Sequence, residues 1–213
     1  MNIFQRQRID FPEYKYIAGV DEAGRGPLAG PVVVASVILK QDASHEMLDD
    51  SKKLTEKKRL NLFDWIINHS IALHIEVVPV EAIDNLNILG ATMYGMDACA
   101  KELTVRPNLI LFDGNKTPVD YQVIDLRGGK VIDYDCLSII KGDSKYACIA
   151  AASVLAKVTR DRIMVELDDK YPMYRFKEHK GYPTKKHFEM LEKYGRCEEH
   201  RKSFLKGMKS KGD

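Results

Sequence analysis

Runs of β-branched residues alternate with segments of helical periodicity along this chain. The run 32–39 is apolar except for Ser36, a pattern typical of a strand buried on both faces. A helix is predicted at 56–69, where Thr55 is a suitable N-cap. Strands interleaved with helices indicate an α/β protein with a mixed β-sheet flanked by helices.

The same patterns predict the remaining elements. Further strands are expected at residues 16–20, 72–78, 109–112, 121–124 and 137–140, and further helices at about 88–103, 144–169, 184–193 and 198–206. Two helix faces are expected to point inward: Leu60, Phe63 and Ile67 in the helix 56–69, and Ala147, Ala151, Val154, Val158 and Val165 in the helix 144–169. Because the second face carries mostly small side chains, that helix is expected to approach the sheet closely.

Length and charge indicate one domain with an appendage. The chain has 213 residues, against about 150 for a typical domain. From Lys170 onward there are 13 Lys and Arg but 6 Asp and Glu, a net charge of +7, whereas the first 169 residues carry −5. We therefore expect a catalytic domain at 1–170 and a basic helical extension at 171–213, packed on the same domain with a disordered end. The extension is either a solvated helical surface or a contact surface for phosphate backbones.

Several classes of protein are excluded by composition. With 45% hydrophobic and 30% charged residues, the chain is neither collagen-like nor disordered. No apolar stretch approaches the roughly 20 residues of a membrane helix, and no secretion signal is recognisable near residue 1, so we expect a cytoplasmic protein that does not bind membranes. The four cysteines form no C-x-x-C pair, so zinc is not indicated.

Three predicted strands lead directly into acidic residues. Asp21 and Glu22 follow the first strand, Asp113 follows the strand at 109–112, and Asp143 comes shortly after the strand at 137–140. Since ligands of open α/β sheets bind beyond strand ends, these four carboxylates are expected to gather at one edge. Any one of them, taken alone, fits an ordinary strand-end or helix-capping role equally well, and Asp143 is also suited to cap the helix beginning at Ser144.

Clustered carboxylates require compensation, because like charges a few ångströms apart raise one another's pKa. Shared protons or bound cations would supply it, and oxygen ligands favour Mg²⁺ or Mn²⁺. Two such ions, about 4 Å apart, would support hydrolysis of a phosphodiester. The residues alone therefore favour, without requiring, a metal-dependent phosphodiesterase.

The loop Gly24-Arg25-Gly26 does not fit a dinucleotide site. The next glycine is Gly30, which gives the spacing G-x-G-x-x-x-G, and a strand rather than a helix follows. No helix N-terminus is thus available for a pyrophosphate. The loop is either an ordinary tight turn or a place where backbone groups approach a sugar hydroxyl or phosphate.

The motif VDEAGRGPLAG at residues 20–30 closely resembles the bacterial type 2 ribonuclease H family, ribonuclease HII. Further motifs agree with that family in order and spacing: DSKKL at 50–54, NIL at 87–89, FDGN at 112–115, KGDS at 141–144, AAASVLAKVTRD at 150–161 and HKGYPT at 179–184. The match covers roughly residues 16–205. Each motif is short, but the ordered set is very specific.

The resemblance implies an RNase H-like fold and a metal-dependent endonuclease that hydrolyses the RNA strand of RNA–DNA hybrids. It also implies incision on the 5′ side of single ribonucleotides embedded in duplex DNA, leaving a 3′-hydroxyl and a 5′-phosphate. By this resemblance, Asp21, Glu22, Asp113 and Asp143 are the catalytic acids and the ligands of two Mg²⁺ or Mn²⁺ ions in the substrate complex. The family's usual form implies a monomer, and recruitment by a replication clamp or polymerase is left open.

The resemblance also assigns substrate-binding residues. Gly24, Arg25 and Gly26 match the loop that reads the ribose 2′-hydroxyl, the group that distinguishes RNA from DNA. Tyr182 matches the tyrosine that packs on the following deoxyribose, although Tyr182 alone would fit a partly buried turn residue. Lys52 and Lys180 are candidate phosphate contacts, each equally compatible with simple solvation.

Three alternatives remain open. Another RNase H-like nuclease that cuts DNA would use similar acids, but the Gly24-Arg25-Gly26 loop combined with Tyr182 argues against it. A non-catalytic hybrid-binding protein would have no reason to keep four mutually repelling acids. Ribonuclease HIII normally carries an additional N-terminal substrate-binding domain, whereas only some 15 residues precede the first strand here.

Overall fold

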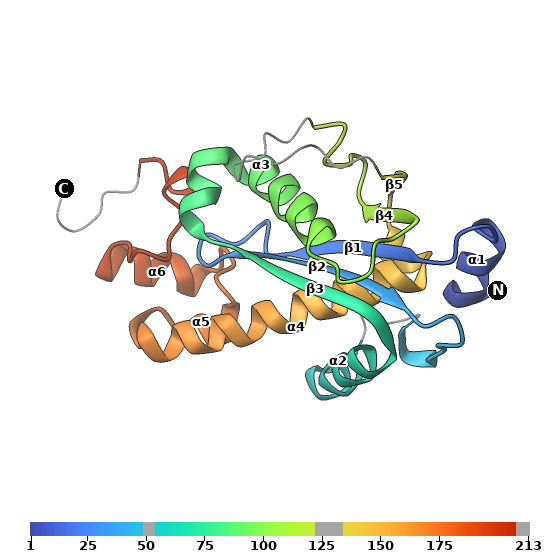
Figure 1. Cartoon of the computed structure of the whole chain (residues 1–213). Coiled ribbons are helices and arrows are strands. Elements are labelled where there is room, and N and C mark those ends of the chain that lie inside the picture. The colour runs from blue at the N-terminus through green and yellow to red at the C-terminus, as the bar shows by residue number, and fades with distance from the viewer. Residues whose placement is uncertain (49–53, 122–133, 208–213) are drawn as a thin grey trace.

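The computed structural model describes residues 1–48, 54–121 and 134–207. Within them one mixed sheet has the strand order β3-β2-β1-β4-β5 (Figure 1). The strands are β1 (Ile17–Ala23), β2 (Val32–Leu39), β3 (Ser70–Val78), β4 (Leu109–Asp113) and β5 (Cys136–Ile139). β2 pairs antiparallel with β1 and β3, whereas β4 pairs parallel with β1 and β5. The predicted α/β class and mixed sheet are confirmed.

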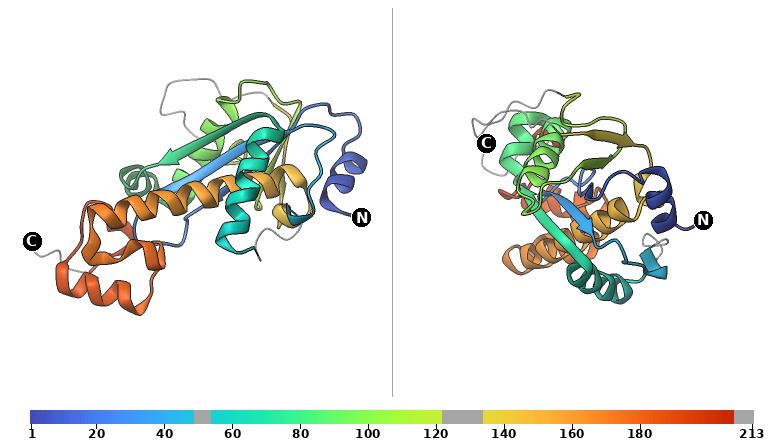
Figure 2. Two further views of the ribbon diagram at one scale, coloured as in Figure 1. Left: turned by 90° about the horizontal axis from the view of Figure 1, so that it is seen from below. Right: turned by 45° about the vertical axis from the view of Figure 1, so that its right-hand side comes forward.

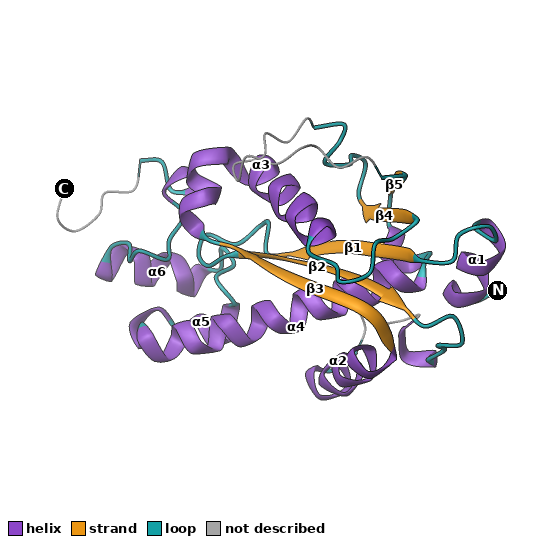
Figure 3. Ribbon diagram, in the orientation of Figure 1, coloured by secondary structure: helices purple, strands orange, loops and turns teal. Residues whose placement is uncertain are grey.

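Helices cover both faces of this sheet (Figure 3). The α-helices of the described residues are α1 (Ile3–Asp10), α2 (Glu56–His69), α3 (Val80–Lys101), α4 (Ala147–Lys170), α5 (Phe176–His179) and α6 (Lys185–Tyr194). α3 lies on one face, and α4 crosses the opposite face beside α2 (Figures 1 and 2). In the described part of the chain, no helix combines the length and apolarity needed to span a membrane.

The β2 strand supplies both layers of the core. Val32, Val34 and Ile38 pack with the α3 side, and the alternating Val33, Ala35 and Val37 pack with the α4 side. This alternation follows from the two-residue period of a strand. The continuous β-branched run therefore forms a strand buried on both faces, as predicted.

The close approach of α4 to the sheet depends on Gly19 in β1. A Cβ atom at this position would lie 2.1 Å from the carbonyl carbon of Cys148, so no larger residue fits without displacing α4. The predicted small-residue face of α4 is buried at Ala147, Ala151 and Val154. Val165, predicted on that face, is 40% exposed, because near it α4 packs through Met164 against Tyr174 and Phe176 instead.

Three expectations for helices need correction, namely those for α3 and α2 and the one for residues 198–206. α3 begins at Val80 rather than near 88, because two helical segments meet at Asn87, which has φ 59° and caps the second segment through its side chain. In α2 the buried residues are Leu62, Phe63 and Ile66, whereas Ile67 is 45% exposed. The spacing of apolar residues in this helix fits both stripes, so it did not distinguish them.

The expected helix at 198–206 is wrong. A single 3₁₀ turn, Lys202–Phe204, is present, because the backbone amides there bind elsewhere: Lys202 and Ser203 donate to the Asp84 carboxylate at 3.0 and 2.9 Å. Of the expected strand at 121–124, Tyr121 lies in a turn, and 122–124 lie outside the described residues. α1 was not predicted.

The segment after α4 has a core rich in aromatic and histidine rings. His179, His187 and His200 are buried, and Phe176 packs its ring against all three. Burial lowers the pKa of His187 to about 4 and that of His200 to about 3. Both rings are therefore neutral in the folded protein near pH 7.

These histidines predict a loss of stability in mild acid. In the unfolded chain they titrate near pH 6.5, so below that pH the unfolded state binds more protons than the folded state and the free energy of unfolding falls. We expect the melting temperature to drop between about pH 7 and about pH 5, and to drop less in His187→Asn, which lacks one titrating ring. An equally steep drop in the variant would contradict this assignment.

Candidate active site

The sheet topology brings three of the predicted acids to one edge. β1 and β4 are parallel neighbours in which Val20 is paired with Phe112, so Asp21 and Asp113 occupy the next positions on adjacent strands. β5 runs parallel to β4 and ends at Ile139, four residues before Asp143. The parallel pairing of β1, β4 and β5 is therefore what gathers these acids from distant parts of the sequence.

Asp21 is buried, with 6% of its surface exposed. Burial raises its pKa well above the ordinary value, and the charges of Glu22 and Asp113 raise it further. A hydrogen bond with the Ser153 side chain of α4 acts in the opposite direction. The protein thus holds a carboxyl group where ionisation is unfavourable unless a cation approaches.

Glu22 also has a raised pKa, but unlike Asp21 it has a cationic neighbour, Arg25, that opposes the rise. Burial raises its pKa, Arg25 opposes that rise, and Asp113 adds to it. The Arg25 Nη1 lies 3.4 Å from Glu22 Oε1, whereas the buried Glu22 Oε2 has no hydrogen-bond partner among the described residues. A buried carboxylate oxygen without a donor is costly, and a bound cation would compensate for it.

A hydrogen bond links the Asp113 side chain to the turn that carries Asp143. The amide of Gly142 donates to Asp113 Oδ1 at 2.6 Å, and the adjoining Asp143 is buried in the 3₁₀ turn Gly142–Ser144. Within the described residues, no three Asp, Glu, His or Cys side chains meet closely enough to hold a metal alone.

The loop after β1 has a backbone that only glycine tolerates. Gly24 has φ +100°, and a Cβ there would lie 2.1 Å from Nε of the buried Arg160. Loop carbonyls are held from beneath by two buried arginines. Arg160 donates to Pro31 and Ala29 at 3.0 and 3.1 Å, and Arg201 donates to Gly24, Arg25, Gly30 and Pro31 at 2.6 to 3.2 Å.

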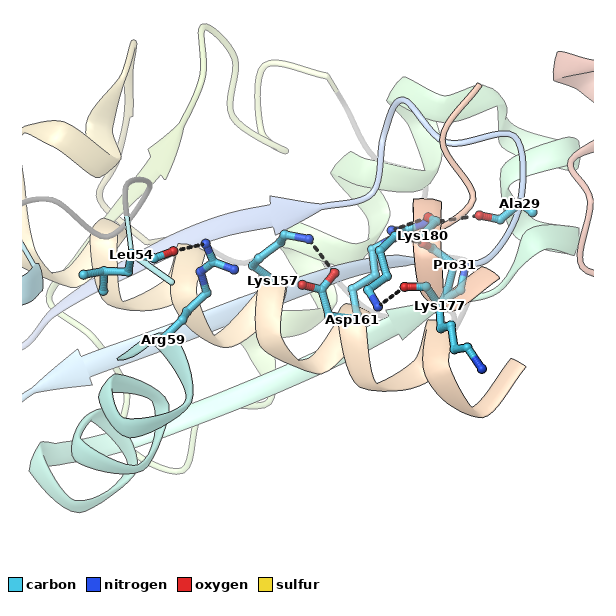
Figure 4. A network of polar contacts seen from close by, with 9 residues as sticks. Ala29, Pro31, Leu54, Arg59, Lys157, Asp161, Lys177 and Lys180 are labelled. Carbon is cyan, nitrogen blue, oxygen red and sulfur yellow. Dashed lines mark hydrogen bonds and ion pairs between the residues drawn. The ribbon is translucent and has the colours of Figure 1, made fainter. Parts of the chain in front are cut away.

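A cleft of about 370 Å³ opens beside the acids. Its walls combine Glu22, the loop at 24–26, Tyr182 and three residues from α2 and α4, namely Arg59, Ser153 and Lys157. Figure 4 shows Arg59 from α2 next to Lys157 on α4, with Arg59 donating to the Leu54 carbonyl and Lys157 paired with Asp161. The cleft therefore has an acidic side and a basic side, as expected for a nucleic-acid backbone approaching bound metal ions.

Tyr182 is held at the mouth of this cleft. Its ring is near Gly26, where a Cβ would lie 3.6 Å away, and the Arg160 guanidinium is 5.9 Å from the ring centroid. The residue remains 42% exposed. An aromatic face available to a ligand beside the glycine loop agrees with the role that the sequence predicts.

Of the two lysines predicted as phosphate contacts, the structure describes Lys180 but not Lys52. Lys180 is close to Tyr182 in sequence, but its ammonium donates to the Lys177 carbonyl at 2.7 Å (Figure 4), and it does not line the cleft described above. Lys52 lies outside the described residues. Both assignments stay predictions.

Sequence reasoning missed the two buried arginines and the basic wall of the cleft. Arg160, Ser153 and Lys157 lie within the motif at 150–161, so the resemblance contained a signal for them. Arg201 had no such signal, because it lies in a segment whose charges were expected either to be solvated or to contact phosphate backbones. Only the structure places its guanidinium under the glycine loop.

Comparison with known proteins identifies close relatives. A family model described as ribonuclease HII matches residues 18–207. A ribonuclease HII from Caldicellulosiruptor bescii is 48% identical over 197 residues, which cover 92% of this chain and 90% of that protein. The family match therefore covers nearly all of the sheet and the segment after α4.

Solved structures agree with the fold. Ribonuclease H2 from Pyrococcus horikoshii has 27% identity and a TM-score of 0.69, covering 88% of this chain and 93% of that one. A ribonuclease HII from Archaeoglobus fulgidus, solved in complex with PCNA, has 25% identity and a TM-score of 0.66, covering 87% and 93%. Bst-RNase HIII in complex with Mn²⁺, at 18% identity and a TM-score of 0.58 over 73% and 55%, shows likeness of fold alone.

Proposed function

This chain belongs to the ribonuclease HII family, and from that premise we propose that its acidic cleft cuts the phosphodiester bond on the 5′ side of a ribonucleotide. The chain is an endoribonuclease that cleaves RNA in RNA–DNA hybrids, including single ribonucleotides within DNA. The position of the cut, the 3′-hydroxyl and 5′-phosphate products and the residues responsible belong to the proposal.

One observation carries the assignment of residues. The half-buried Glu22, whose buried Oε2 lacks a donor among the described residues, lines the same cleft as the glycine loop and Tyr182. A metal-binding acid, a backbone that approaches a sugar closely and an exposed aromatic ring thus adjoin one another. This combination suits a substrate that is both a phosphodiester and a ribose.

We propose that Asp21, Glu22, Asp113 and Asp143 hold two divalent ions, Mg²⁺ or Mn²⁺, in the substrate complex. The raised pKa values of Asp21 and Glu22 support this assignment, since a nearby cation relieves the cost of their ionisation. Such ions supply an activated water and stabilise the leaving oxygen. The carboxylates orient them, and Gly142 fixes the Asp113 side chain through its amide.

The glycine loop and Tyr182 provide selectivity in this proposal. Backbone groups of Gly24, Arg25 and Gly26 meet the 2′-hydroxyl, and Arg25 pairs with Glu22 until a phosphate competes for its guanidinium. Tyr182 packs on the deoxyribose that follows the ribonucleotide. Lys52 and Lys180 are proposed to contact phosphates farther along the duplex.

We also propose a division of labour along the chain. Residues 1–170 carry the four acids, and the basic extension 171–213 adds Tyr182 and backbone affinity, with the protein acting as a monomer. The hydrogen bonds from Arg201 to the loop at 24–31 support packing of the extension on the catalytic domain. The substrate partner is then an RNA–DNA hybrid or duplex DNA containing ribonucleotides.

Cleavage of a DNA duplex carrying one ribonucleotide tests the proposal. We expect nicking 5′ of that ribonucleotide in Mg²⁺ or Mn²⁺, no nicking in EDTA, and an intact all-DNA duplex, because cleavage requires both metal and a 2′-hydroxyl. Product ends are identified by ligation and by labelling of the 5′-phosphate. Tight binding without nicking would instead indicate a hybrid-binding protein, and equal cutting of both duplexes a DNA nuclease.

A further inference from the structure

A chain of hydrogen bonds runs through the buried histidines after α4 and ends at Tyr182. The backbone amide of Cys197 donates to Nδ1 of His200 at 3.0 Å. Nε2 of His200 and Nε2 of His187 are 3.1 Å apart, and Nδ1 of His187 is 3.0 Å from the Tyr182 carbonyl oxygen. Neither His187 nor His200 lines the cleft described above.

The backbone groups at the two ends fix the positions of the protons between them. An amide N–H can only donate, so Nδ1 of His200 accepts and the proton of that ring is on Nε2. The Cys197 Sγ also lies 3.1 Å from this Nδ1, where its S–H can donate as well. The N–H at Nε2 of His200 donates to Nε2 of His187, whose proton is therefore on Nδ1. A carbonyl can only accept, so the His187 N–H donates to Tyr182. Every group in the chain is satisfied when both rings are neutral.

A second proton on either ring would break this chain. On His187 it would place two N–H groups face to face at the 3.1 Å contact between the histidines, and on His200 it would face the Cys197 amide N–H at 3.0 Å. Burial lowers the pKa of both rings, in agreement with a neutral pair. The two rings therefore act as neutral donors and acceptors of hydrogen bonds in this chain.

The Tyr182 carbonyl lies in the turn that aims the tyrosine ring. It also accepts from the Thr184 amide at 2.8 Å, and the Tyr182 amide donates to the His179 carbonyl at 2.9 Å. These two bonds stay within the 179–184 turn. Thr184 of the same turn caps α6 by accepting from the His187 amide at 3.2 Å. The bond from the His187 ring is the one that links the Tyr182 carbonyl itself, through His200, to the segment at 197–201.

We infer that His187 and His200 are positioning residues that hold Tyr182 at the mouth of the cleft and so set the preference for isolated ribonucleotides. The inference rests on the proposed contact of Tyr182 with the deoxyribose. The turn is also bound to the glycine-loop segment through the Leu28 amide and the Gly181 carbonyl, and to Arg160 through the Lys180 carbonyl. Loss of the His187 bond would therefore leave the turn in place but free the Tyr182 peptide to shift, which would change the direction of the tyrosine ring. Selectivity would then fall more than general activity.

The test compares two substitutions at one position. His187→Leu removes the donor, whereas the amide of His187→Asn can place its N–H where Nδ1 stood. The measured quantity is the ratio of kcat/KM on a duplex with one ribonucleotide to kcat/KM on a continuous RNA–DNA hybrid. We expect this ratio to fall about fivefold to tenfold in His187→Leu, the loss of one hydrogen bond, and less than about threefold in His187→Asn.

Controls separate positioning from general stability. Met96→Ala empties part of the core on α3, across the sheet from α4, and is expected to lower the melting temperature with an unchanged ratio. Tyr182→Ala should lower the ratio by at least as much as His187→Leu, and the double variant should show no further loss, because both changes act on one ring. Additive losses, or equal losses in Leu and Asn variants, would overturn the inference.

Two further outcomes distinguish this inference from the proposed function. An unchanged ratio in Tyr182→Ala would refute the proposed role of Tyr182 itself, whereas a lowered ratio there with an unchanged one in His187→Leu would refute the histidine chain alone. Long-range ¹H–¹⁵N NMR of the wild-type protein near neutral pH tests the chain without any substitution. It should find protons on Nδ1 of His187 and Nε2 of His200, and the opposite tautomer on either ring would overturn the inference.

Discussion

Asp113→Asn is expected to lower kcat by about a thousandfold or more while leaving the fold intact. The metal site supplies several kcal/mol of charge stabilisation, and each loss of about 1.4 kcal/mol slows the reaction tenfold. The asparagine oxygen can still accept the bond from the Gly142 amide. Because Asp113 raises the pKa of Asp21 and Glu22, removing its charge should leave the metal-free melting temperature unchanged or higher.

The measurements are single-turnover cleavage of a duplex with one ribonucleotide and a thermal melt in EDTA. Asp169→Asn is the matched control, since Asp169 is exposed near the end of α4 and its substitution changes the net charge equally. Wild-type cleavage by Asp113→Asn would remove Asp113 from the metal site. A large fall in melting temperature would show instead that its role is structural.

Arg201→Met is expected to destabilise the protein by about 3 to 5 kcal/mol, among the largest effects of any single substitution here. The side chain is 0% exposed, and it satisfies carbonyls of Gly24, Arg25, Gly30 and Pro31. Methionine fills similar space but offers no donor, so the Gly24, Arg25 and Gly30 carbonyls would lose the Arg201 bonds, whereas Pro31 would keep its bond from Arg160. The melting temperature should fall by about 10 °C.

Arg201→Lys and Lys202→Met complete the comparison. Lysine keeps the charge but lacks the planar fork that reaches several carbonyls at once, so an intermediate loss is expected. Lys202 is the exposed neighbour, and its side chain should be dispensable. If Arg201→Met and Lys202→Met melted at the same temperature, the buried guanidinium would not be what holds the glycine loop.

The strands and the predicted order of the elements could be read from sequence because burial leaves a local signal. The alternation in β2 and the periodicity of α4 are determined mainly by neighbouring residues in the chain. The acids were also located, since each follows an apolar run, although only the family resemblance selected Asp143 from several comparable aspartates. Whether they act together as catalytic residues stays a prediction that Asp113→Asn addresses.

What could not be predicted depends on contacts between distant segments. Arg201 binds carbonyls about 170 or more residues away, and no local pattern marks an arginine as buried. Another contact between distant segments explains why the helix expected at 198–206 does not form. There the Asp84 carboxylate accepts from the backbone amides of Lys202 and Ser203, which a helix would have used. At Asn87, one residue with positive φ separates the predicted helix from a preceding helical segment that begins at Val80 and was not predicted.

The arginine beneath the glycine loop also has a consequence for synthesis of the protein. Translation produces the loop at 24–31 long before residue 201, whose guanidinium donates to the carbonyls of that loop. The ribosome must therefore release residue 201 before this loop acquires its final hydrogen bonds. Nascent chains that stop short of Arg201 would carry all four acids but lack these bonds to the loop, so the complete cleft forms only after that residue has emerged.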